Sequence, residues 1–461
     1  MEKIREILKK YIFSGKDFYV RLMTLALPII IQNFISSCLN MVDTVMIGQV
    51  GETQIAAVGI ANQYFLLFNL VIIGIHSGCG VFISQFWGKG DRVSIRKVVG
   101  IGLYISSIAA LIFMIVALLF PEGIVSIFSE NDPLVISEGA AYLRIVCISY
   151  IFTALSFGYA FASRSIGNAF MPMVISALAL GCNTILNYIL IFGHMGAPVL
   201  GVRGAAIATL IARVFETLLI IVWIYTSRNV LAVRLKDLLG ISSKFIAGVV
   251  KTMIPVVLNE SCWGLAYIIY SVAYGRIGTQ AIAAVQICNT VVNLFTVAIF
   301  GVAAAAGVMI GHKIGENNED EAYTYAWRFT ILSAIGGILT GIILAAGTPA
   351  ILSLFDVSAE VHNSARLILY ITSLVMVVKF FNIIQIVGIL RGGGDARYAF
   401  IAEGITMWFI GVPLAFLGAL VFKLPVHWVS ALVMFEEVAK AIAVIVRLVS
   451  GKWIKNVVNS F

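Results

Sequence analysis

The feature that most constrains this chain is a succession of long apolar stretches. Each can cross roughly 30 Å of hydrocarbon as a helix, at about 1.5 Å per residue. Only 12% of the 461 residues are charged, about half the share found in soluble globular proteins. The sequence therefore predicts an all-α polytopic membrane protein and excludes a soluble enzyme, a nucleic-acid-binding domain and a disordered protein. We expect twelve transmembrane helices, at residues 22–44, 56–83, 98–120, 134–158, 166–192, 204–227, 246–272, 282–310, 326–347, 365–388, 398–422 and 426–449.

Lysine and arginine gather in alternate loops between these stretches. When the basic residues at the span ends are counted with the adjoining loops, one side of the predicted membrane carries 23 of them and the other side carries 3, while five lie deeper within the spans. Cytoplasmic loops carry the excess of positive charge in membrane proteins. We therefore expect a multi-pass protein of the plasma membrane with both termini in the cytoplasm. The net charge of +8 then reflects membrane topology, and we expect no nucleic-acid partner.

The same pattern divides the chain into five segments. Residues 1–21 are basic and amphipathic, and we expect them to form an interfacial N-terminal segment on the cytoplasmic side. Residues 22–227 and 246–449 are expected to form two six-helix bundles, joined by a basic cytoplasmic linker at residues 228–245. Residues 450–461 are expected to be a cytoplasmic tail.

The chain also repeats itself at an offset of 227 residues. Pro28 and Gly51 fall on Pro255 and Gly278, and eight of the fifteen positions between residues 48 and 62 agree, where chance would give roughly one or two. Each half has an even number of spans, so both halves have the same orientation in the membrane. We expect two bundles related by a pseudo-two-fold axis along the membrane normal, with a central cleft between them, a plan that transporters use for alternating access.

Ionisable residues within the spans are candidates for function, because a charge at the bilayer centre costs at least ~2.5–3.5 kcal/mol. Some of them are spaced three or four residues apart on one helix and can form local salt bridges. Arg213 with Glu216 is one such pair, and Lys440 with Glu436 or Glu437 is another. The candidates are Asp43, Arg144, Arg213, Glu216, Glu260, Lys379, Glu403, Glu436, Glu437 and Lys440.

Asp43 has no basic residue three or four positions away. Asn183 and Asn187 lie on one face of the fifth span, and Thr209 lies in the sixth. We expect these four residues to form a polar cluster that couples transport to an ion. A carboxylate in such a dry place can exchange a proton, and its oxygens also suit a hard cation such as Na⁺. The alternative is that Asp43 caps the loop that follows its helix.

Glu260 is a second candidate for ion coupling. It follows Pro255 by five residues, and a proline inside a helix frees a backbone carbonyl about one turn earlier. Neither Glu260 nor Lys379 has a partner of opposite charge one turn away. We expect Glu260 to bind H⁺ or Na⁺, and the alternative is a static salt bridge between Glu260 and Lys379.

Aromatic and methionine side chains in the spans predict a substrate cavity, because such side chains adapt to different apolar ligands. Ordinary packing remains open for most of them. With the polar residues of the same spans, the expected cavity residues are Tyr64, Phe65, Phe68, Asn259, Trp263, Tyr267, Lys379, Asn382, Met407 and Trp408. The glycine-rich segment Arg391–Asp395 lacks the phosphate-loop pattern and predicts a tight turn between helices. Apart from the coupling ion, we expect no cofactor and no enzymatic activity.

Several segments resemble the signatures of the multidrug and toxic compound extrusion (MATE) transporters. They are Asp43–Gly48, Gln85–Gly88, Asn183–Gly193, Gly201–Thr209, Pro255 with Glu260, Leu390–Asp395 and Ser450–Trp453. The resemblance covers nearly the whole chain. It implies two six-helix bundles in a V and an antiporter that expels organic, often cationic and amphipathic compounds in exchange for H⁺ or Na⁺.

The resemblance also implies roles for individual residues. The acidic residue of the family's first span falls on Asp43, the pair in the fifth span falls on Asn183 and Asn187, and the threonine of the sixth span falls on Thr209. Position 187 carries asparagine where the family pattern has aspartate. The family's glutamate in the seventh span usually lies about one turn farther past the proline than Glu260.

Two other functions are compatible with a polytopic chain. A flippase for lipids or lipid-linked oligosaccharides has a related architecture but more often has extra spans and a strongly basic cavity. A channel or an intramembrane enzyme is the other alternative, although we find no paired catalytic groups at matching depth. We expect small organic substrates and membrane lipids as partners, and a monomeric protein.

Overall fold

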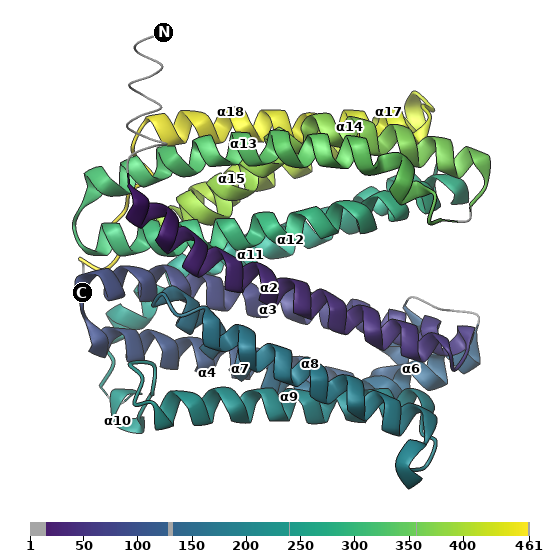
Figure 1. Cartoon of the computed structure of the whole chain (residues 1–461), viewed down its shortest axis with the longest axis horizontal. Coiled ribbons are helices and arrows are strands. Elements are labelled where there is room, and N and C mark those ends of the chain that lie inside the picture. Colours follow the sequence, from purple (N-terminus) through teal and green to yellow (C-terminus); the bar gives the residue numbers. More distant parts are fainter. Residues whose placement is uncertain (1–14, 128–131, 239, 356, 460–461) are drawn as a thin grey trace. The chain divides into compact units, whose positions relative to one another are not determined.

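The computed structural model describes residues 15–127, 132–238, 240–355 and 357–459, and every regular element in these ranges is a helix (Figure 1). In chain order, the first half contains α2 (Lys16–Gly48), α3 (Glu52–Lys89), α4 (Arg92–Leu119), α5 (Pro121–Ser126), α6 (Pro133–Val146), α7 (Ser149–Ser165), α8 (Phe170–Phe192), η2 (His194–Gly196), α9 (Gly201–Thr226) and α10 (Leu235–Leu238). The second half contains α11 (Ser243–Gly275), α12 (Thr279–Gly315), α13 (Glu319–Leu352), α14 (Ala359–Ile383), η3 (Ile384–Leu390), α15 (Ala396–Thr406), η4 (Met407–Gly411), α16 (Val412–Phe416), η5 (Leu417–Val421), α17 (Val426–Val433) and α18 (Phe435–Val449).

Ten of the described helical stretches are long and apolar enough to cross a membrane. The pair α6 and α7, which is bent by 50°, makes an eleventh span if it crosses as one. The last span expected from the sequence, residues 426–449, is divided at Met434 into α17 and α18. The chain is therefore an all-α polytopic membrane protein, as the apolar stretches predicted.

The N-terminal segment differs from the expectation in part. Residues 1–14 lie outside the described part of the chain, and residues 16–21 belong to α2. The first helix therefore begins before the predicted span. Phe18 at its start is buried and packs against Tyr325 and Phe329, with ring centroids 4.9 and 5.1 Å away, which explains why the helix continues through the basic segment.

The duplication predicted from the sequence is present in the backbone. Residues 16–48 of α2 and residues 243–275 of α11 lie 227 residues apart at both ends. The pair Gly167 and Gly394, at the same offset, has φ angles of 93° and 86°, a left-handed conformation that glycine adopts without strain. The two halves therefore fold as copies of one helical unit.

Contacts divide the chain into two compact units. Unit 1 comprises the residues up to Ala26 together with those from Leu258 onward, and unit 2 comprises Leu27–Val257. The start of α11 belongs to unit 2 because α3 leaves room for it there. A Cβ atom added at Gly78 would lie 2.7 Å from Cα of Met253. The boundaries 22–227 and 246–449 follow the spans rather than these contacts, and they stay a prediction.

Candidate functional site

The four polar residues expected to form one cluster meet in unit 2. The side-chain amide of Asn187 in α8 donates a hydrogen bond to the Asp43 carboxylate of α2 and another, of 3.1 Å, to Oδ1 of Asn183. Asn183 donates in turn to the Thr209 hydroxyl of α9, at 3.5 Å. Asn183 and Asn187 are both fully buried. Three helices therefore hold one carboxylate among neutral oxygen and amide groups.

The position of Asp43 does not fit a helix cap. The residue lies within α2, which continues to Gly48, and its carboxylate accepts from another helix. Among the described residues it forms no ion pair, whereas the nearby Arg213 is paired with Glu216 at 2.8 Å. That pair confirms the salt bridge predicted from the helix spacing. The interaction of Tyr142 in α6 with Thr209 adds a cluster member that the sequence reasoning missed.

Other polar side chains of unit 2 form a continuous series of hydrogen bonds, which we call the polar chain of unit 2. The guanidinium of Arg164 donates two hydrogen bonds to Oε1 of Gln32, at 2.6 and 3.2 Å. Nε2 of Gln32 donates to Ser176 at 2.9 Å, and Ser176 donates to Glu216 at 3.0 Å. The polar chain ends at Arg213, whose guanidinium donates a hydrogen bond to Glu216. It links α7, α2, α8 and α9, so it ties together the helices that carry Asp43, Asn187 and Thr209.

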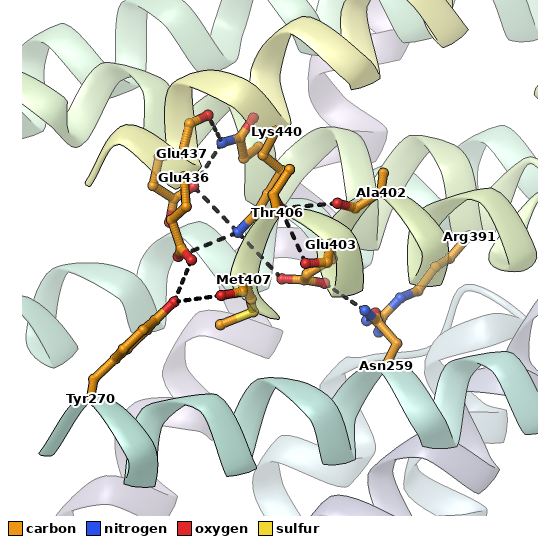
Figure 2. A network of polar contacts seen from close by, with 11 residues as sticks. Asn259, Tyr270, Arg391, Ala402, Glu403, Thr406, Met407, Glu436, Glu437 and Lys440 are labelled. Atoms are coloured by element: carbon orange, nitrogen blue, oxygen red, sulfur yellow. Dashed lines mark hydrogen bonds and ion pairs between the residues drawn. The ribbon is translucent and has the colours of Figure 1, made fainter. Parts of the chain in front are cut away.

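Unit 1 has a corresponding network, shown in Figure 2. The Arg391 guanidinium donates to the Asn259 side chain and forms an ion pair of 2.5 Å with Glu260. Asn259 donates to Glu403 of α15 at 2.7 Å. The alternative of a static bridge between Glu260 and Lys379 is therefore wrong. The residue that pairs with Glu260 is Arg391, which directly follows the π-helical segment η3.

Lys440 is the centre of this network (Figure 2). Its ammonium nitrogen lies 3.7 Å from Glu403, 3.9 Å from Glu436 and 3.6 Å from Glu437. These distances exceed the ~2.7–2.9 Å of a direct charge-assisted hydrogen bond. The Tyr270 hydroxyl of α11 donates to Glu436. The predicted pairing of Lys440 with its helix neighbours is confirmed, and Glu403 shares the same lysine.

A cavity of about 230 Å³ lies within unit 1. Five of the residues expected around a substrate line it, namely Trp263, Tyr267, Lys379, Asn382 and Met407. Asn259 and Trp408 are outside its lining, and Asn259 is fully buried. Its ionisable lining residues, tyrosine and cysteine aside, are Glu260, Lys379, Arg391, Glu403, Glu436, Glu437 and Lys440. The cavity is therefore both aromatic and strongly charged.

The other three expected cavity residues belong to unit 2, where they pack in an aromatic cluster. The rings of Phe68 and Tyr150 stack at 4.5 Å, and Phe65 lies 5.7 Å from the same tyrosine. The Tyr64 hydroxyl donates to the carbonyl of Phe113 at 2.8 Å. These residues form an aromatic cluster of unit 2, and their contact with substrate stays a prediction.

Several network residues escaped the sequence reasoning. Gln32 and Tyr270 carry no charge and did not stand out among the spans. Arg391 was assigned to the turn, which is present at residues 391–394, but its side chain is buried. The repeat was the missing signal, because Gln32 and Arg164 lie 227 residues before Asn259 and Arg391. In the described part of the chain, no group of three or more His, Cys, Asp and Glu residues could hold a metal ion.

Comparisons with known proteins agree with the duplicated membrane fold. The sequence model of the MatE family matches residues 28–189 and 254–417. The chain is 28% identical to the uncharacterised transporter YisQ of Bacillus subtilis, covering 94% of this chain and 95% of that protein. It is 24% identical to the probable multidrug resistance protein NorM of Thermotoga maritima, with coverage of 95% and 93%. A solved multidrug resistance MATE family transporter in an outward-facing conformation has a TM-score of 0.85 at 19% identity, covering 94% of both chains.

Proposed function

Because the chain belongs to the MatE family of membrane transporters, we propose that it exports organic, often cationic and amphipathic compounds in exchange for H⁺ or Na⁺. The family handles small organic substrates, and its members are transporters rather than enzymes. This assignment does not favour the lipid flippase. We also propose that the protein is a monomer. It lies in the plasma membrane with both termini in the cytoplasm.

The observation that carries the coupling proposal is the environment of Asp43. Its carboxylate accepts a hydrogen bond from the neutral amide of Asn187, and no basic residue in the described part of the chain forms an ion pair with it. A buried carboxylate is stabilised by a compensating positive charge. A proton or a Na⁺ ion from outside the cell can supply that charge and then leave again, and Asn183 and Thr209 are connected to Asp43 through the hydrogen bonds of Asn187.

Coupling requires that the ion bind the two conformations of the transporter with different affinity, since equal affinity would shift no equilibrium. The Asp43 cluster joins side chains from α2, α8 and α9. Relative movement of these helices would change the number of oxygens around the ion. The proposed cycle therefore exchanges an ion at Asp43 for release of an organic compound to the outside.

Glu260 remains the second proposed ion site. Its carboxylate is paired with Arg391 at 2.5 Å, so an ion could bind there only after the guanidinium had moved away. Arg391 would then act as a tethered cation that competes with the ion. The aromatic and methionine side chains Trp263, Tyr267 and Met407 beside it would contact the apolar part of a substrate, as would the aromatic cluster at Tyr64, Phe65 and Phe68 in unit 2.

The test is transport of a fluorescent organic cation by the purified protein in lipid vesicles, with a Na⁺ or an H⁺ gradient imposed alone. We expect one gradient to drive substrate movement by the natural protein, and Asp43→Asn to reduce the driven rate at least about tenfold, the loss that follows from about 1.4 kcal/mol of binding energy. Glu52→Gln is the matched control, because it removes an exposed carboxylate at the start of the next helix.

Undiminished gradient-driven transport by Asp43→Asn would contradict the assignment of the coupling site. Transport that responds to neither gradient in the natural protein would contradict antiport itself. A current far above transporter turnover would instead indicate a channel.

A further inference from the structure

The two halves of the chain use the same polar scaffold. The contacts from Arg164 through Gln32 to Ser176 in unit 2 recur from Arg391 through Asn259 to Glu403 in unit 1, at positions 227 residues later. Arg213, at the end of the first chain, corresponds to Lys440. The scaffold contains two cationic residues in each half, namely Arg164 and Arg213 in the first and Arg391 and Lys440 in the second.

The acidic residues, by contrast, differ between the halves. Glu260, Glu403, Glu436 and Glu437 correspond to Asn33, Ser176, Thr209 and Leu210, none of which is charged. Because unit 2 builds the same scaffold without acids at these positions, the scaffold itself does not require them. The additional acids of unit 1 therefore call for an explanation beyond helix packing.

The formal charges of the two networks differ as well. In unit 2, Asp43 and Glu216 balance Arg164 and Arg213. The cavity of unit 1 is lined by four glutamates but by three basic residues, namely Lys379, Arg391 and Lys440. With every group ionised, the cavity is one positive charge short of neutrality. An uncompensated charge is costly inside a membrane protein, so one further positive charge would stabilise this network.

The repeat also indicates where that charge belongs. The coupling position of unit 2 pairs an acid on α2, Asp43, with a hydroxyl on α9, Thr209. The corresponding residues of unit 1 are Tyr270 and Glu436, which are hydrogen-bonded to each other (Figure 2). The same two positions therefore carry an acid and a hydroxyl in both units, with the two groups exchanged between the helices.

An orphaned acceptor supports a ligand beside these carboxylates. Asn382 is 2% exposed and lines the cavity. Its amide nitrogen donates to the Glu437 carboxylate at 2.7 Å, whereas its Oδ1 atom is buried and has no hydrogen-bond partner. A buried carbonyl oxygen without a donor calls for a compensating group, and a cation or a donor molecule would provide one.

We propose that the cavity of unit 1 binds one monovalent positive charge, a proton or a Na⁺ ion, at Glu436, with Tyr270 as the positioning donor. Glu436 would then be the counterpart of Asp43 in the second unit, and it could take up the positive charge while Glu260 is still paired with Arg391. The inference rests on the proposed function for its role in coupling, but the binding itself can be measured without transport. The charged and titratable groups around Glu436 are Tyr270 and Tyr274 from α11, Lys379 from α14, and Glu437 and Lys440 from α18, with Glu403 of α15 on the far side of Lys440.

The experiment uses the purified full-length protein with Asp43→Asn, so that the site of unit 2 is absent. One arm measures binding of radioactive Na⁺ at fixed pH, and the other follows the infrared band of protonated carboxyl groups as the pH is changed. We expect one of the two arms to report a single site. Adding Glu436→Gln should abolish that signal, and adding Tyr270→Phe should weaken binding roughly 10-fold, as loss of a supporting hydrogen bond does at ion sites.

Lys379→Gln gives a change that structural damage would not imitate. It removes a positive charge from the same cavity, so we expect the ion or proton to bind several-fold more tightly. Survival of the signal in the variant with Glu436→Gln, absence of any signal in both arms, or weaker binding with Lys379→Gln would each overturn the inference. A failure of Asp43→Asn to reduce transport would contradict the proposed function and leave this binding result unaffected.

Discussion

At the scale of single residues, Gly411 in the short segment η4 makes room for the contact between Tyr270 and Glu436. A Cβ atom at this position would overlap both the tyrosine hydroxyl and the carboxylate. We therefore expect Gly411→Ala to push the two groups apart and to lower the free energy of unfolding by about 1–3 kcal/mol, as overpacking does. Thermal unfolding in detergent measures this change.

Gly404 is the matched control for this prediction. It lies in the same expected span, and a Cβ atom there would have its nearest neighbour 3.9 Å away, on the Phe400 ring. Gly404→Ala should leave the midpoint of unfolding unchanged or raise it, because alanine favours a helix more than glycine by ~1 kcal/mol. Equal losses for the two variants would show that Gly411 has no special role.

Gln32 tests the polar chain of unit 2. Its side-chain oxygen accepts both hydrogen bonds from Arg164, and the residue is 5% exposed. Gln32→Leu would leave the guanidinium without this acceptor. We expect a loss of about 1–3 kcal/mol in the free energy of unfolding, the cost of an unsatisfied buried group.

The comparison for Gln32→Leu is Ser37→Ala, which removes an exposed hydroxyl that bonds only to its own helix, at the carbonyl of Asn33. Denaturation in mixed micelles should detect little change for that variant. If Gln32→Leu is as stable as Ser37→Ala, the chain from Arg164 to Ser176 does not stabilise unit 2.

At the scale of elements, the segment from residue 450 onward packs against the turn between η3 and α15, whereas the sequence predicted only a cytoplasmic tail. Trp453 is fully buried, and the backbone N–H of Lys455 donates to the carbonyl of Gly393 at 2.8 Å. Asp395, 1% exposed, forms ion pairs with Arg447 at 2.7 Å and with Lys455 at 2.6 Å. The segment from residue 450 therefore fastens the turn between η3 and α15, next to Arg391.

Trp453→Ala should therefore destabilise the protein by about 3–5 kcal/mol, as the loss of a large buried side chain does. Trp428→Ala provides the comparison, because that tryptophan is 57% exposed, and we expect its loss to have little effect on unfolding. Tryptophan fluorescence during denaturation distinguishes the two cases. A Trp453→Ala protein as stable as Trp428→Ala would show that the tail does not hold the turn.

The elements also show what the sequence could and could not predict. Long apolar stretches predict helices reliably because a membrane requires every backbone group to be bonded within the segment. Their ends depend on tertiary contacts, as at Phe18, where packing extends α2 into the basic segment. The sequence analysis did not predict the division of the last span at Met434, just before the charged residues Glu436 and Glu437.

At the scale of the whole molecule, the repeat in the sequence predicted that the two halves share one arrangement of helices. It did not predict which side chains contact one another. Side chains from one cluster, such as Asp43 and Asn187, were foreseen because the acid had no local partner. Arg391 was not foreseen as the partner of Glu260, because its position in a turn said nothing about the direction of its side chain. The repeat aligns Arg391 with Arg164 and Asn259 with Gln32, so the contact between Arg391 and Asn259 has a counterpart in the first half, whereas Glu260 aligns with the uncharged Asn33.

The central claim is that the substrate and the ion cross the membrane in opposite directions. The ion binds to one carboxylate in each unit. The most direct measurement loads lipid vesicles containing the protein with a fluorescent organic cation, imposes no ion gradient, and follows uptake of radioactive Na⁺ or of protons as the substrate leaves. We predict that substrate efflux drives ion uptake in the natural protein and in Glu52→Gln, and that the variant carrying both Asp43→Asn and Glu436→Gln takes up no ions. Substrate efflux without ion uptake in the natural protein, or unchanged ion uptake in the double variant, would contradict the account.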